Sequence, residues 1–118
     1  MSLTVYFTED HIDDWNRNWS PLGQLNITHN LNRMADHCGL YEPFWRPEEM
    51  NIPQPVRAKD LLGFVVQGYE KLKREKEECI RLYTPPNKWG NYAALLEFTE
   101  DFIRICLERP HSYVRASR

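Results

Sequence analysis

The chain has 118 residues, of which 42% are hydrophobic and 27% charged, and its formal net charge is -2. This length supports one hydrophobic core, so we expect a single domain over residues 1–118. A mean hydropathy of -0.66, without an apolar run of about 18 residues in the sequence, argues against a membrane partner. Basic and acidic residues are interleaved, which argues against duplex nucleic acid as a partner.

The N-terminal sequence and the cysteines bear on the compartment. MSLTVYFTED lacks the basic and then apolar pattern of a signal peptide, so the sequence favours the cytoplasm. Cys38, Cys79 and Cys106 are odd in number and widely spaced, which predicts buried thiols instead of a disulfide framework or a zinc site.

A strand and a loop are predicted first. Residues 3–7 (LTVYF) are rich in β-branched and aromatic side chains and predict a short strand. Residues 11–26 mix two tryptophans with polar residues, Pro and Gly and show neither helical nor alternating periodicity, which predicts a loop with aromatic anchors.

A helix is predicted from Thr28, because four apolar residues recur at the spacing of one helix face: Leu31, Met34, Ala35 and Cys38. Asn26 or Thr28 can cap its start, and Gly39 suits the left-handed residue that ends it. Four prolines in residues 40–55 exclude a long helix there, and we expect Phe44 and Trp45 to cover the core as a lid.

Two longer helices and a final strand complete the prediction. Apolar residues at spacings of three and four indicate a helix from about Ala58, with a break near residues 73–76. A third helix runs from Tyr92 to about Arg109, and residues 113–115 form a strand that pairs with residues 3–7. The sequence therefore predicts a small α+β domain, mainly helical, with about three helices and paired terminal strands.

Two polar segments are candidates for a binding site. In residues 25–34 (LNITHNLNRM), Asn and Thr alternate at a helix start, either as caps or as the rim of a pocket for an anion or a phosphate. In residues 84–92 (TPPNKWGNY), two prolines and Gly90 make a stiff corner, while Trp89 and Tyr92 offer flat faces that either pack inside or stack on a ring. Both alternatives stay open for each segment.

The histidines and the acidic loop are weaker candidates. His29, Arg33 and His37 are four residues apart and suit a groove lined with cations, but a metal site is not predicted, because no carboxylate or Cys lies at ligand spacing. The acidic residues of the loop are Glu9, Asp10, Asp13 and Asp14, and such a loop is usually only solvated. The sequence contains none of the common hydrolase or nucleotide-binding motifs, so neither catalytic residues nor a cofactor are predicted.

The segments Asn26-x-Thr28-x-Asn30 and Pro85-Pro86-Asn87-Lys88-Trp89-Gly90, in this order, resemble a group of small bacteriophage and prophage proteins of unassigned function. Lys88 stands where that group has Gly. The resemblance covers most of the chain from Asn26 onward. It implies a mobile-element origin and a place in the host bacterial cytoplasm, and by class-level analogy a role in binding.

The leading hypothesis is a non-catalytic protein that sequesters a small polar ligand, such as a nucleotide-derived immune signal. Its predicted ligand-binding residues are Asn26, Thr28, Asn30, Arg33, Asn87, Lys88, Trp89 and Tyr92. One alternative is an inhibitor or adaptor that binds a host protein through Trp15, Trp19, Phe44 and Trp45. Another is a small nucleotide hydrolase with His29 or His37 beside a carboxylate of the acidic loop. The sequence leaves a homo-oligomer open.

Overall fold

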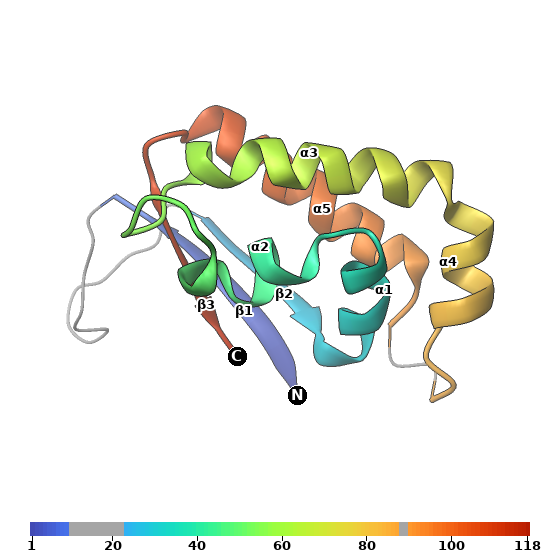
Figure 1. The fold of residues 1–118 in the computed structure, drawn as a ribbon. Coiled ribbons are helices and arrows are strands. Elements are labelled where there is room, and N and C mark those ends of the chain that lie inside the picture. The colour runs from blue at the N-terminus through green and yellow to red at the C-terminus, as the bar shows by residue number, and fades with distance from the viewer. Residues whose placement is uncertain (10–22, 88–89) are drawn as a thin grey trace.

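The computed structural model describes residues 1–9, 23–87 and 90–118 as an antiparallel sheet with helices packed on one face (Figure 1). Strands β1 (Ser2–Thr8), β2 (Gly23–Thr28) and β3 (Tyr113–Ser117) lie in the order β2-β1-β3. The helices of the described residues are η1 (His29–Leu31), α1 (Asn32–His37), α2 (Tyr41–Trp45), η2 (Pro47–Glu49), α3 (Ala58–Arg74), α4 (Lys76–Tyr83) and α5 (Tyr92–Glu108). The predicted α+β class is confirmed.

Strand β1 is the central strand because it pairs with both β2 and β3. Its alternate residues Leu3, Val5 and Phe7 are buried beneath the helices. Both predicted terminal strands form, and they pair with each other, with Phe7 opposite Val114. Strand β2 corrects the end of the predicted loop over residues 11–26, since residues 23–26 pair with β1 instead. Residues 10–22 lie outside the described residues.

The first helical turn begins where the sequence places it. The backbone N–H of Asn30 donates to Oγ1 of Thr28 at 3.3 Å, so Thr28 is the cap of η1. Asn26, the other candidate cap, lies within β2 instead. Gly39 has a φ of 78° just beyond α1, as its predicted role requires.

The long helices α3 and α5 follow the predicted boundaries. Helix α3 starts at Ala58, and Glu75 separates it from α4, inside the predicted break. Oδ1 of Asn91 accepts a hydrogen bond from the N–H of Ala94 at 2.9 Å and caps α5. Within the described residues, no helix has the length and apolar character that crossing a bilayer requires.

Aromatic rings join the helices to the sheet. The ring of Phe44 lies 4.9 Å from that of Phe98 and 4.8 Å from that of Phe102, which in turn lies 5.2 Å from the ring of Phe7. Phe44 and Trp45 are buried, so the predicted lid is confirmed and these two residues are not the exposed anchors of a partner interface. Trp15 and Trp19, the other two anchors of that hypothesis, lie outside the described residues.

The three cysteines are buried, as predicted, and none of them forms a disulfide. Burial raises the pKa of the Cys38 and Cys106 thiols to about 12. The sulfur atoms of Cys38 and Cys79 lie 3.8 Å apart between α1 and α4. These thiols are therefore protonated packing groups.

Candidate functional site

A groove of about 400 Å³ lies between the start of the helical layer and the corner that leads from α4 to α5. One wall is formed by His29, Asn30, Asn32 and Arg33, and the other by residues 82–87. Three of the predicted ligand-binding residues, Asn30, Arg33 and Asn87, line this groove. The two candidate segments, far apart in the sequence, therefore form opposite walls of one groove.

Gly90 explains how the two segments come so close. Its φ is 99°, a conformation that side chains disfavour. A Cβ atom at this position would lie 2.6 Å from Cγ2 of Thr28 and 3.0 Å from Cγ of Leu31. Gly90 thus packs directly against the start of η1. Thr28 caps η1 and contacts Gly90, so it packs beneath the groove instead of lining it.

His29 is held in one orientation by Trp45. The indole Nε1–H of Trp45 donates to Nδ1 of His29 at 2.9 Å, so a neutral His29 carries its proton on Nε2. Tyr41 stacks on Trp45 with ring centroids 5.7 Å apart. Because of these contacts, His29 offers an N–H donor from a fixed ring.

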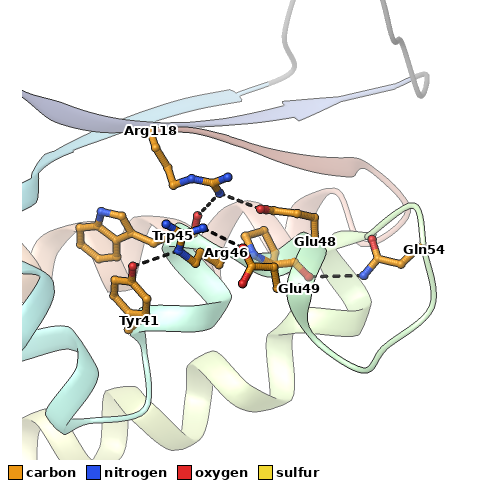
Figure 2. Close-up of polar contacts among 8 residues, drawn as sticks. Tyr41, Trp45, Arg46, Glu48, Glu49, Gln54 and Arg118 are labelled. Atoms are coloured by element: carbon orange, nitrogen blue, oxygen red, sulfur yellow. Dashed lines mark hydrogen bonds and ion pairs between the residues drawn. The ribbon is translucent and has the colours of Figure 1, made fainter.

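Figure 2 shows the hydrogen bonds that connect Arg118 to Trp45 and to the residues around it. Nη1 of Arg118 donates to the carbonyl oxygen of Trp45 and to Oε2 of Glu48, both at 2.7 Å. Arg46 donates to the hydroxyl of Tyr41 at 3.2 Å and to Oε2 of Glu49 at 2.7 Å. Trp45, which orients His29 in the groove wall, is therefore part of a hydrogen-bond network that extends from α2 to Arg118.

A second hollow, also of about 400 Å³, lies on the other side of Arg33 and Tyr83. Asn32, Asp36, His37 and Tyr41 complete its lining. The guanidinium of Arg33 lies 6.0 Å from the centre of the Tyr83 ring, so these two side chains form the wall shared by both hollows. The predicted line of His29, Arg33 and His37 thus borders two adjoining hollows.

The charges of the first groove favour an anionic ligand. Among the described residues that line it, Arg33 carries a permanent positive charge and no carboxylate is present. The amides of Asn30, Asn32 and Asn87 each supply both donors and an acceptor. This set suits a ligand with one anionic group and a polar ring or sugar edge.

Three of the predicted ligand-binding residues do not line this groove: Thr28, which caps η1, Asn26 and Tyr92. Nδ2 of Asn26 donates to the hydroxyls of Ser2 and Thr4 at 3.1 and 2.9 Å, on the sheet face away from the helices. Tyr92 is buried, and its hydroxyl donates to the carbonyl of Leu72 at 2.9 Å, so its ring packs inside the protein instead of stacking on a ligand. Lys88 and Trp89 lie outside the described residues.

The hydrolase hypothesis placed a histidine beside the acidic loop of residues 9–14. His37 instead lies beside Glu75, with Nε2 of His37 2.9 Å from Oε1 of the carboxylate. This hydrogen bond lowers the pKa of the Glu75 carboxyl, so it stays ionised at neutral pH. Of the loop's acidic residues, Glu9 is exposed and the other three lie outside the described residues.

Sequence reasoning missed Tyr83 as a groove residue. It ends α4, with only Thr84 between it and Pro85, and the last residue of a helix that runs into a proline corner lies beside that corner. The position of Tyr83 in the sequence could therefore have predicted its place in the groove. No local sequence feature predicts the hydrogen bond between His37 and Glu75, because the two residues are brought together only by the packing of α1 on α4.

Comparisons of the chain with protein-family models, with curated proteins and with solved structures found no match. The resemblance to phage proteins stays a prediction.

Proposed function

We propose that the chain is a binding protein, without catalysis of its own, that captures a small polar ligand with a phosphate or similar anionic group. The observation that carries this proposal is the convergence of Asn30, Arg33 and Asn87 on one groove of about 400 Å³. That volume falls within the range of about 300 to 1,000 Å³ that is usual for small-molecule sites.

A nucleotide-like molecule fits this chemistry best. Arg33 pairs with a phosphate, since a guanidinium binds such oxygens with two parallel hydrogen bonds. The asparagine amides hydrogen-bond to base or ribose edges. Tyr83, which is half-buried beside Arg33, offers a ring on which a base stacks.

The resemblance of residues 26–30 and 85–90 to phage proteins supports a narrower form of the proposal. A protein from a mobile element that holds a nucleotide in the bacterial cytoplasm would withdraw a nucleotide-derived signal of host immunity. Sequestration needs affinity and no chemistry, which agrees with a groove that is lined with amides, an arginine and a tyrosine.

Native mass spectrometry of the protein purified from immune-activated bacterial lysate tests the proposal. We expect a bound, nucleotide-like mass that is released by heat. Asn30→Ala and Arg33→Gln remove exposed groove side chains and should weaken binding about tenfold or more, because hydrogen bonds to charged groups contribute about 1.5 to 3 kcal/mol each.

Arg81→Gln is the matched control, since Arg81 is exposed on α4 but does not line the groove. Equal loss of binding in Arg33→Gln and Arg81→Gln would show a general charge effect and contradict the proposed site. A ligand-free mass together with a tightly bound host protein would replace the proposal with the inhibitor or adaptor function.

A further inference from the structure

Three side chains that can ligate a metal ion gather where α1 meets the corner between α3 and α4. His37 ends α1, Glu75 lies between α3 and α4, and Glu78 lies in the first turn of α4. One nitrogen or oxygen atom from each side chain lies within 4.8 Å of the others. This cluster is separate from the groove of the proposed function, whose walls do not include these residues.

The break at Glu75 creates the arrangement. Glu75 has φ and ψ of -105° and 32°, which ends α3 and lets α4 start in a new direction towards α1. Glu75 and Glu78 are three residues apart, a spacing that places both side chains on the same side of α4. The corner therefore presents two carboxylates to the imidazole of His37.

We propose that His37, Glu75 and Glu78 bind a divalent transition-metal cation of the zinc type. Imidazole and carboxylate ligands bind zinc at about 2.0 to 2.2 Å, so two ligand atoms of one ion lie no more than about 4.4 Å apart. The cluster reaches this spacing with a small side-chain movement, and Glu78 is exposed and has room for it. The imidazole favours zinc over magnesium or calcium, which prefer oxygen ligands alone.

Tyr83 offers a hydrogen-bond partner for the ring nitrogen of His37 that does not face the carboxylates, as metal-binding histidines commonly have. Its hydroxyl lies 3.5 Å from Nδ1 of His37, and the two rings lie 5.0 Å apart. When a metal takes the lone pair of Nε2, the imidazole proton resides on Nδ1 and is donated towards the Tyr83 oxygen. The second hollow, lined by His37 and Tyr83, leaves space for water at the open coordination positions.

A neighbouring arginine lowers the metal affinity of the site, and the nearby cysteines do not belong to its ligands. Nη2 of Arg74 lies 3.8 Å from Oε2 of Glu75 and opposes the cation, so the affinity is lower than that of a closed site with four ligands. Cys38 and Cys79 adjoin the cluster in sequence, but both are buried and their sulfur atoms face each other at 3.8 Å. The proposed site therefore holds one imidazole, two carboxylates and solvent.

Zinc titration of the whole chain, after treatment with a chelator, tests the proposal by calorimetry. We expect one equivalent to bind. Glu78→Gln should weaken zinc binding at least about tenfold, because replacing a residue that only supports a metal ligand already costs about that much affinity. Glu77→Gln makes the same charge change at an exposed neighbour in α4 and should leave binding unchanged.

Cobalt(II) serves as a spectroscopic probe of the same site. Its visible spectrum in the wild-type chain should show nitrogen and oxygen coordination, and it should change in His37→Gln. The proposal is overturned if the wild-type chain shows no saturable zinc binding, or if Glu77→Gln weakens it as much as Glu78→Gln. Because Glu78 is exposed, that variant keeps the test valid even if His37→Gln fails to fold.

Discussion

At the scale of single residues, Gly90 allows the backbone before α5 to pack directly against the start of η1. It combines a positive φ with a close approach to Thr28 and Leu31. Gly90→Ala should destabilise the protein by about 2 to 4 kcal/mol, because backbone strain and overpacking add. Denaturant unfolding measures this loss.

Gly39→Ala separates the effect of backbone strain from the effect of overpacking. Gly39 also has a positive φ, but a Cβ there would meet no atom within 4 Å. Its replacement should cost only about 1 to 2 kcal/mol, the strain of a left-handed residue. If both variants lose the same stability, the contact of Gly90 with η1 contributes nothing and the corner is held by other residues.

At the scale of elements, α3 contains two glycines with opposite surroundings. A Cβ on Gly68 would clash with the buried side chain of Leu40 and lie 3.0 Å from the carbonyl oxygen of Cys38. Gly68→Ala should therefore destabilise the protein by about 1 to 3 kcal/mol through overpacking, despite the better helix propensity of Ala. Thermal unfolding should show a lower Tm.

Gly63→Ala in the same helix provides the comparison. Gly63 is exposed and a Cβ there meets nothing within 4 Å, so Ala should stabilise the protein by up to about 1 kcal/mol. A rise in Tm for both variants would mean that the turn at Cys38 and Leu40 adapts, and that Gly68 is not required for packing.

Elements with regular apolar spacing were predictable from the sequence, whereas β2 was not. Ile27 is the fully buried residue of β2, and the strand carries polar side chains such as Gln24 and Asn26 on its outer face. An edge strand of this kind has the composition of a loop, so its identity depends on pairing with β1. By contrast, the cap at Thr28 and the break near Glu75 follow from local rules and were predicted.

The candidate site was predictable in part for the same reason. Asn30, Arg33 and Asn87 stood out because each lies in a segment of unusual local composition. For Tyr92 the sequence left open whether the ring packs inside or stacks on a ligand, since a residue at a helix start faces inward or outward only according to how the helix docks. The meeting of His37 and Glu75 depends on tertiary packing alone.

At the scale of the whole molecule, Phe44 ties the short helix α2 to the core. It is fully buried between Phe98 and Phe102. Phe44→Ala should cost about 3 to 5 kcal/mol, a large part of the total of about 5 to 15 kcal/mol for a small domain. Denaturant unfolding tests this, with Phe64→Ala as the control.

Phe64 lies on α3 and is 45% exposed, so its replacement removes far less buried surface. We expect a loss of less than about 1 kcal/mol there. A similar loss for both phenylalanines would contradict the assignment of α2 as a lid on the core.

The pairing of β1 with β3 also has a consequence during synthesis. Strands β1 and β2 can pair as soon as residue 28 has left the ribosome, but the other edge of β1 waits for β3. At roughly 5 to 20 residues per second, residues 29–112 take about 4 to 17 seconds to be made. Throughout that interval the central strand of the nascent chain has an unpaired edge, on which a strand of a neighbouring chain can pair and aggregate.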